Sequence, residues 1–280
     1  MPEMQFTKTQ GLGNDFVLVD CLQGQLDDAD LPALAIVTCD RHFGIGADGL
    51  VRLLPSQVAD YRMQIMNPDG SEAEMCGNAT RCFAKYLFDR GMVGERTSIE
   101  TLAGIKVVDI TASEGKAVTM TVNMQVPRLD AADIPIRGYV GRVISQPLHV
   151  GAAKYSITCV SMGNPHCVVF VDSVDAVDLE RLGPAIETHP AFPAKTNVEF
   201  AQVIRRDEIK FRVWERAAGV TLACGTGACA AVVAGVLNGV LDRKATVHLP
   251  GGDLLVEWRE DGDVYKTGPA REVFTGTFKY

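Results

Sequence analysis

The fold is decided by the stretch Met75-Cys76-Gly77-Asn78-Ala79-Thr80-Arg81-Cys82 and by its later counterpart Ala223-Cys224-Gly225-Thr226-Gly227-Ala228-Cys229. In each, a cysteine, a glycine and a small hydrogen-bonding residue come before a run whose pattern predicts a helix. Asn78 and Thr226 are types that favour helix N-caps, so the cysteines are predicted at the positive ends of two helix dipoles. A thiol in that position is easier to ionise, and the nearby backbone N–H groups can bind an anion. Two such helix starts predict one site with two thiols.

An internal repeat supports this interpretation over the ordinary one, in which a buried cysteine is only a small apolar side chain. Cys224 follows Cys76 by 148 positions. Polar residues recur near this offset: Asn67 aligns with Glu215 and Gly49 with Asn197, while Asn14 aligns with Asn164 at 150 positions. Two similar halves that face each other would bring both helix starts to one cleft.

The bulk composition is that of a water-soluble enzyme. The 280 residues can form two domains, and 47% hydrophobic with 22% charged residues is ordinary for globular proteins. A net charge of −8 disfavours nucleic acid or an anionic membrane as a partner. The N-terminus lacks the apolar run of a signal peptide, and the longest apolar run, 229–237, is too short to span a bilayer. We therefore expect a cytoplasmic enzyme whose eight cysteines stay reduced.

Many short strands and few helices, without a βαβ rhythm, predict an α+β fold. Strands are expected near residues 4–8, 16–19, 61–65, 98–101, 106–110, 118–122, 155–160, 167–171, 198–203, 209–215, 247–249, 254–258 and 273–278. A short helix is expected from Leu31 to Thr38 with Asp30 as its cap. The N-terminal domain is expected to comprise residues 1–123 and 270–280 and to carry Cys76. The C-terminal domain, 124–269, carries Cys224.

Other site types are disfavoured. Residues 44–49, Gly-Ile-Gly-Ala-Asp-Gly, match the letters of a dinucleotide-binding loop, but that loop must follow a strand and open a helix. The cysteine pairs lack the C-x₂-C spacing of zinc sites, so no metal is expected. P-loop and G-x-S-x-G motifs are absent from the sequence.

The chain resembles the diaminopimelate epimerase family over almost its whole length. The similarity is carried by Gly11-Leu12-Gly13-Asn14-Asp15-Phe16, Asn67 with residues 71–78, Gly163-Asn164-Pro165-His166, Glu215-Arg216 and residues 223–227. It implies two pseudosymmetric domains, each a β-barrel-like sheet around a central helix, with the active site in the cleft between them. It also implies an isomerase without pyridoxal phosphate or another cofactor, which interconverts L,L- and meso-diaminopimelate for lysine and peptidoglycan precursor synthesis. The sequence does not set the oligomeric state and leaves a homodimer open.

The resemblance also implies roles for individual residues. Cys76 and Cys224 are the catalytic pair, and His166 and Glu215 adjust their protonation. The residues implied to bind substrate are Gly77, Asn78, Gly225 and Thr226 at the α-carboxylate, Asn14 and Glu215 at the α-ammonium, and Asn67, Asn164, Asn197 and Arg216 at the distal amino acid group.

The chemistry of these residue types fits epimerisation. Inversion of an α-carbon removes a proton from one face and supplies a proton on the other, which a thiolate and a thiol on opposite faces can do. Without a pyridoxal group, preorganised N–H donors at two helix starts must stabilise the carbanion. The guanidinium fork of Arg216 suits a distal carboxylate.

Two positions differ from many family members. Gly49 stands where many have Gln, so that contact must come from backbone, water or a neighbour. Ala79 stands where many have Gly, which requires a helical backbone at Ala79. Racemases of histidine, proline or hydroxyproline, and a non-catalytic amino-acid-binding protein, remain the alternatives.

Overall fold

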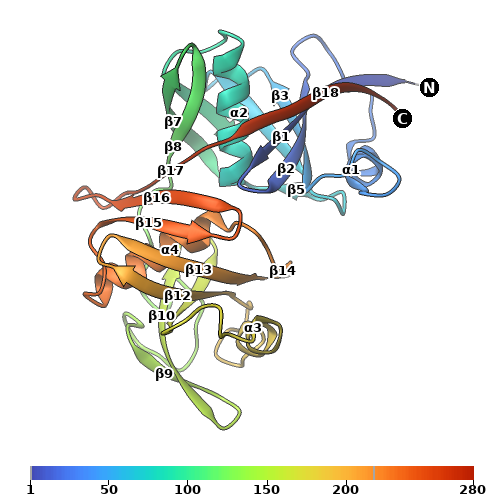
Figure 1. Cartoon of the computed structure of the whole chain (residues 1–280). Coiled ribbons are helices and arrows are strands. Elements are labelled where there is room, and N and C mark those ends of the chain that lie inside the picture. Colours follow the sequence, from blue (N-terminus) through green and yellow to red (C-terminus); the bar gives the residue numbers. More distant parts are fainter. Residues whose placement is uncertain (1, 217) are drawn as a thin grey trace. The chain divides into compact units, whose positions relative to one another are not determined.

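The computed structural model describes residues 2–216 and 218–280, and this part of the chain forms four helices and eighteen strands (Figure 1). The predicted α+β class is confirmed. The chain divides into two compact units. Unit 1 runs to Val122 and resumes at Thr267, while unit 2 is the continuous segment Asn123–Lys266.

Unit 1 is a mixed sheet packed on one long helix. Its elements are β1 (Glu3–Gly11), β2 (Asn14–Asp20), α1 (Leu31–Cys39), β3 (Gly49–Leu54), β4 (Tyr61–Met66), β5 (Glu72–Ala73), α2 (Gly77–Asp89), β6 (Arg96–Thr101), β7 (Gly104–Ser113), β8 (Lys116–Asn123), which ends one residue beyond the unit, and β18 (Arg271–Lys279). β2–β3 and β4–β6 pair in parallel, while β1–β2, β3–β4, β6–β7 and β7–β8 are antiparallel. Strands β1, β2, β7 and β18 pack against α2.

Unit 2 repeats this order of pairings. Its elements are β9 (Gln146–Val150), β10 (Ala153–Ser161), β11 (Pro165–Phe170), α3 (Leu179–Glu187), β12 (Asn197–Arg205), β13 (Glu208–Glu215), β14 (Gly219–Val220), α4 (Gly225–Leu237), β15 (Lys244–Leu249), β16 (Gly252–Trp258) and β17 (Val264–Gly268), whose last residues belong to unit 1. β11–β12 and β13–β15 are parallel, as β2–β3 and β4–β6 are, and β10–β11, β12–β13 and β15–β16 are antiparallel. Residues Gly227–Gly235 of α4 are all buried, which explains why this helix is apolar on every side.

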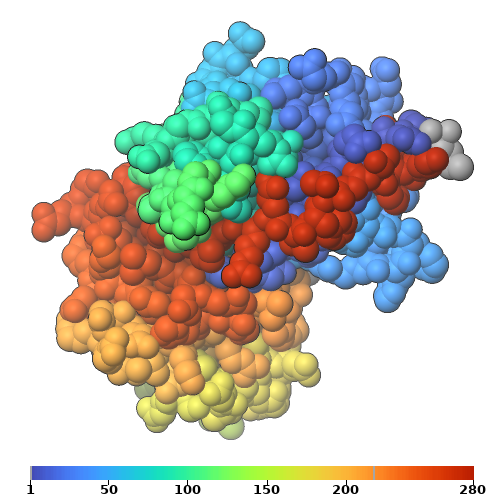
Figure 2. All heavy atoms as spheres, turned by 45° about the horizontal axis from the view of Figure 1, so that its top comes forward, coloured from blue at the N-terminus to red at the C-terminus, as the bar shows by residue number. Residues whose placement is uncertain are grey.

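The last strand of the chain returns to the first. β18 pairs antiparallel with β1, from Glu3 opposite Lys279 to Gln10 opposite Arg271. A salt bridge joins Lys279 Nζ and Glu3 Oε1 at 3.2 Å. Figure 2 shows the C-terminal residues lying along the N-terminal strand. Unit 1 therefore contains both ends of the chain.

The helix starts differ in one detail from the sequence prediction. The N-caps of α2 and α4 are Cys76 and Cys224 themselves, both with extended backbones, and Asn78 and Thr226 lie inside the first turn. The prediction that Asn78 and Thr226 cap the helices was wrong, because each helix begins directly at the glycine. The helical backbone required at Ala79 is confirmed. The prediction of α1 with Asp30 as its cap is also confirmed. Asp30 Oδ1 accepts the Ala33 N–H.

Several elements were not anticipated, among them α3 and β9. Helix α3 has Asp178 as its cap, and both the cap and the first residue lie 148 positions after Asp30 and Leu31. The internal repeat therefore contained the signal for α3. Strand β9 pairs with β10 in the same way as β18 pairs with β1.

Each unit has its own buried apolar cluster. Residues Val17, Leu50 and Ala35 belong to the one in unit 1, and Ile157, Phe200 and Ile186 to the one in unit 2. No described helix combines the length and the apolar character needed to cross a bilayer.

Candidate functional site

In unit 1, Cys76 meets the turn between β1 and β2. Its Sγ donates to Asn14 Oδ1 at 3.6 Å, and the cysteine is only partly buried. Asn78 Nδ2 donates to the same Asn14 oxygen at 3.1 Å. The first N–H groups of a helix have no intrahelical acceptor, so the start of α2 offers donors for an anion beside the thiol. The structure thus brings together Cys76, Gly77, Asn78 and Asn14, all of which the sequence had singled out.

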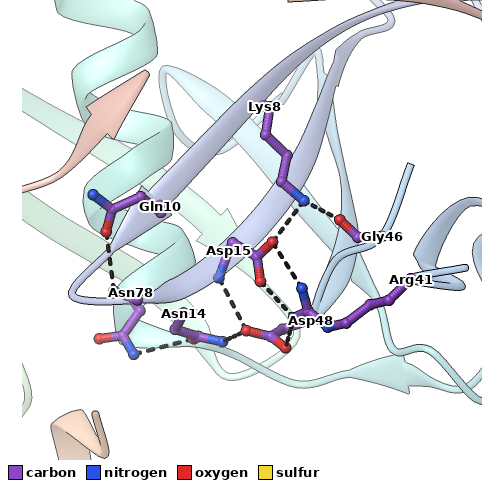
Figure 3. A network of polar contacts seen from close by, with 9 residues as sticks. Lys8, Gln10, Asn14, Asp15, Arg41, Gly46, Asp48 and Asn78 are labelled. Carbon is purple, nitrogen blue, oxygen red and sulfur yellow. Dashed lines mark hydrogen bonds and ion pairs between the residues drawn. The ribbon is translucent and has the colours of Figure 1, made fainter. Parts of the chain in front are cut away.

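A charged cluster contacts the Nδ2 end of the Asn14 amide, opposite the oxygen that faces Cys76 (Figure 3). Asn14 Nδ2 donates to Asp48 Oδ2 at 2.6 Å, and Arg41 bridges Asp48 and Asp15 with contacts of 2.7 Å. Lys8 Nζ reaches Asp15 Oδ2 at 2.6 Å. Burial pushes the pKa of Asp15 upward, but hydrogen bonds from Arg41 and Lys8 outweigh it and hold that pKa below its usual value. Lys8, Arg41 and Asp48 were not predicted from the sequence. Asp48 lies within residues 44–49, which match only the letters of a nucleotide motif.

That false motif lies between α1 and β3, so it neither follows a strand nor opens a helix. Gly49 begins β3 opposite Phe16, and a Cβ on Gly49 would approach the Met66 carbonyl oxygen at 3.1 Å. A larger side chain at this position would require the β4 backbone to shift.

Buried Arg81, one turn into α2, fixes the first turn of its own helix. Its Nη1 donates to Asn78 Oδ1 at 3.0 Å and to the Gly77 carbonyl at 3.3 Å, while Nε donates to the Pro269 carbonyl at 3.1 Å. Asn67 lies apart in a turn, where Nδ2 donates to Ser71 Oγ at 2.9 Å.

In unit 2, Cys224 is more enclosed than Cys76. Its side chain is 3% exposed, and Sγ accepts the Gly227 N–H at 3.4 Å, which caps α4. The Thr226 hydroxyl lies 3.6 Å from the same sulfur. Gly225 and Thr226 supply the first N–H groups of α4 beside the thiol.

The expectation that both thiols ionise easily was wrong for Cys224. Burial raises its pKa well above the ordinary value, and the carboxylates of Glu215 and Glu199 raise it further. The hydroxyl of Thr226 and the Gly227 N–H lower this pKa by less. Desolvation therefore outweighs the helix dipole at this thiol, which favours its protonated form.

His166 and Glu199 form a fully buried pair beneath Cys224. His166 Nδ1 lies 2.6 Å from Glu199 Oε1, and both side chains are 0% exposed. His166 Nε2 lies 2.9 Å from Asn164 Oδ1, and Asn164 Nδ2 reaches Thr226 Oγ1 at 3.4 Å. A hydrogen-bonded path thus runs from Glu199 through His166 and Asn164 to Thr226, beside the Cys224 thiol.

Glu199 is a functional candidate that the sequence analysis missed. Burial raises its pKa, against the opposing effect of His166. Among the described residues, its Oε2 has no hydrogen-bond partner. A Cβ on Gly227 would lie 2.8 Å from Glu199 Oε1 and 3.1 Å from Cys224 Sγ, so only the bare glycine separates the carboxyl group from the thiol. A single acidic residue in the otherwise apolar run 198–201 was the available signal.

The remaining predicted residues lie around the end of β13. Glu215 Oε1 accepts the Thr221 hydroxyl at 2.5 Å. Asn197 is buried, with Nδ2 donating to the Pro165 carbonyl at 2.8 Å and Oδ1 accepting the Arg216 N–H at 2.9 Å. This side chain therefore braces the backbone of β11 and Arg216. The Arg216 guanidinium is exposed and donates to the Ala194 carbonyl at 3.2 Å.

Each unit thus presents a thiol at a helix start, N–H donors beside the thiol, and amide or carboxylate groups within reach. Such a set can exchange a proton and bind a carboxylate. Among the residues the structure describes, no cluster of three or more His, Cys, Asp or Glu side chains is arranged to hold a metal ion.

Comparison with known sequences identifies close relatives. The family model for diaminopimelate epimerase matches residues 6–129 and 158–273. The diaminopimelate epimerase of Pelotomaculum thermopropionicum is 60% identical over 278 residues, covering 99% of both chains. That of Heliobacterium modesticaldum is 54% identical over 277 residues, covering 98% of this chain and 99% of the relative. A Methanococcus maripaludis enzyme of the same name is 51% identical, with coverage of 98% and 99%.

Solved structures with low sequence identity share the fold. A PhzF-family phenazine biosynthesis protein from Bacillus anthracis has a TM-score of 0.72 at 18% identity, with both chains covered completely. A hydroxyproline epimerase from Agrobacterium vitis has a TM-score of 0.69 at 15% identity, covering 98% of this chain and 92% of that one.

Proposed function

Because this chain belongs to the diaminopimelate epimerase family, we propose that it inverts the α-carbon of diaminopimelate by proton transfer between Cys76 and Cys224. The enzyme is an isomerase of that family. Its substrate is diaminopimelate, and its product differs only in the configuration of one carbon. The reaction belongs to the synthesis of lysine and of peptidoglycan precursors, and it takes place in the cytoplasm.

One observation carries the mechanistic proposal. Cys76 and Cys224 are the N-caps of two helices of equal length, each thirteen residues. A thiol in this position can exchange a proton with an α-carbon whose carboxylate binds to the same helix start. Two such arrangements suit a reaction in which one proton leaves one face of the α-carbon and another is added to the opposite face.

The two sites differ in a way that suggests how the proton moves. The Cys224 thiol is protonated, because burial and the nearby carboxylates raise its pKa. In the direction in which Cys224 is the acid, a Cys76 thiolate removes the α-proton and becomes a thiol. The electron pair left on the carbon then takes the Cys224 proton, which leaves a thiolate there. The reverse direction exchanges the two roles, so the enzyme needs no net proton.

The other groups bind and orient the substrate. The N–H groups of Gly77, Asn78, Gly225 and Thr226 receive the α-carboxylate and stabilise the charge that develops when the proton leaves. Asn14 Oδ1 and the Glu215 carboxylate accept the α-ammonium.

The distal amino acid group binds to Asn67, Asn164 and Arg216. Asn197 contributes mainly by holding Arg216, since both ends of its amide already contact backbone. The preference for a substrate with a second carboxylate comes from the exposed Arg216 guanidinium.

The chain is built of two pseudosymmetric domains, N-terminal with Cys76 and C-terminal with Cys224. The matching strand pairings and the equal sequence spacing of the helices support this pseudosymmetry. Each domain wraps its sheet around a central helix, α2 or α4.

Loss of the α-proton signal in D₂O, followed by NMR, tests the proposal. Diaminopimelate should exchange, while histidine, proline and hydroxyproline should not. Cys76→Ser and Cys224→Ser should each lower epimerisation by about 100-fold or more, the low end for an acid–base group. A smaller loss in either variant would show that this cysteine is not one of the two bases.

A further inference from the structure

We infer that Asp48 is a positioning residue that fixes the amide of Asn14 with its oxygen toward the substrate's α-ammonium. No role for Asp48 follows from the catalytic pair or from the substrate contacts described above. The inference rests on the proposed function for the identity of the ammonium group, but the orientation of the amide rests on the geometry of unit 1 alone.

The geometry leaves Asn14 one orientation. A carboxylate paired with a guanidinium can only accept hydrogen bonds, and Asp48 Oδ1 lies 2.7 Å from Arg41 Nη2. The Asn14 atom 2.6 Å from Asp48 Oδ2 must therefore be the donor Nδ2. The amide oxygen consequently points the other way, where it receives the Cys76 thiol at 3.6 Å and Asn78 Nδ2 at 3.1 Å.

Asp48 is itself firmly anchored. Its Oδ2 also accepts the Asp15 N–H at 3.0 Å, and its own N–H donates to the Asp15 carbonyl at 2.8 Å. Figure 3 shows the Asp48 carboxylate between Asn14 on one side and Asp15 with Arg41 on the other. The loop that precedes β3 and the β1–β2 turn are thereby locked to each other beside Cys76.

The orientation matters because the two ends of an amide have opposite effects on a cation. The oxygen attracts an ammonium group, whereas the NH₂ end repels it. If Asp48 were uncharged and able to donate, Asn14 could turn around and present N–H groups to the substrate and to the Cys76 sulfur. Substrate binding would weaken, and a thiolate at Cys76 would gain a donor.

A set of three variants separates orientation from charge. Asp48→Asn frees the amide of Asn14 and removes one negative charge from the cluster. Asp15→Asn removes the same charge from the same cluster of Lys8 and Arg41, but leaves the Asp48–Asn14 bond in place. The exchange variant Asn14→Asp/Asp48→Asn restores the charge and the hydrogen bond with donor and acceptor reversed.

Two readouts apply to each variant. The first is KM and kcat for diaminopimelate epimerisation. The second is the rate at which iodoacetamide alkylates Cys76 at one fixed pH, measured by peptide mapping, which needs no substrate. Circular dichroism and thermal unfolding of every variant check that the fold is intact.

We expect Asp48→Asn to raise KM by about 10- to 100-fold, the range for a hydrogen bond to a charged group, with a smaller effect on kcat. Cys76 alkylation should be faster than in Asp15→Asn, and the exchange variant should recover most of the KM. Equal effects of Asp48→Asn and Asp15→Asn on both readouts would overturn the inference, as would an exchange variant no better than Asp48→Asn. If the wild type failed to exchange the α-proton of diaminopimelate, the proposed function would fail, and the alkylation rates alone would decide the orientation of Asn14.

Discussion

Gly227→Ala places one methyl group between the Cys224 thiol and the Glu199 carboxyl group. The new Cβ would lie 2.8 Å from Glu199 Oε1, 3.1 Å from Cys224 Sγ and 3.1 Å from Phe211 Cζ. None of these neighbours can swing away into solvent, because Glu199 is fully buried against His166, Phe211 is 1% exposed and Cys224 is 3% exposed. To restore contacts of 3.4 Å, the neighbours must move by roughly 0.3 to 0.6 Å.

The energetic cost follows from that displacement. Overpacking a tight core costs about 1–3 kcal/mol, and the better helix propensity of alanine returns at most about 1 kcal/mol. We therefore expect a net loss of about 1–2 kcal/mol in the free energy of unfolding. A misplacement of 1 Å costs a catalytic group about 100-fold, so a shift near half that size should lower kcat about 10-fold.

Gly235→Ala is the matched control in the same helix. Its Cβ would lie 2.3 Å from Leu241 Cδ1, a clash away from the thiol, so this variant should lose stability and keep its kcat. Thermal unfolding measures the stability of each variant. The initial rate of epimerisation at saturating substrate gives its kcat. If both variants lowered kcat equally, or if Gly227→Ala kept the wild-type kcat despite reduced stability, the spacing between Glu199 and Cys224 would have no catalytic meaning.

Three further predictions concern charged groups. Glu199→Gln removes a charge that raises the pKa of Cys224, so iodoacetamide should alkylate Cys224 at lower pH than in the wild type; an unchanged pH profile would contradict this. Arg216→Met should raise KM for diaminopimelate about 10-fold or more, as expected for a lost charged hydrogen bond, and unchanged kinetics would exclude contact with the distal group. The hydrogen bond to Asp253, with a further one to Glu208, raises the pKa of His248. Protonated His248 therefore contributes its full stabilisation below the unfolded pKa near 6.5, and this contribution disappears as the pH rises through the folded pKa. Wild type and His248→Gln should thus differ more in free energy of unfolding at pH 6 than at pH 9, and an equal difference at both would refute the assignment.

The sequence predicted the parts of the molecule that depend on local pattern. The alternation in residues 61–65 predicted β4, and the Asp-Leu-Pro start predicted α1 with its cap. The helix starts were predicted two residues too late, since the cysteines themselves are the caps. Helix α3 was missed because Gly183 and Pro184 interrupt its pattern, although the repeat offset pointed to it.

Properties that depend on surroundings could not be predicted in the same way. The pKa of Cys224 depends on how deeply tertiary packing buries the sulfur and on carboxylates from β12 and β13. Glu199 and Asp48 contact residues that are distant from them in sequence, so no local motif marks them. The proposed catalytic groups could be named from the sequence, whereas the groups proposed to orient them required the folded chain.

The return of β18 to β1 has a consequence for how the protein is made. Unit 2 is one continuous segment, so it can fold as soon as the ribosome has released it. β1 emerges before β18 and must wait for residues 271–279 before the pairing of the two strands can form. Until residues 271–279 have been synthesised, the nascent polypeptide carries an open strand edge that invites association with other chains. A truncation before β18 would therefore expose β1, which is made first, and leave unit 2 intact.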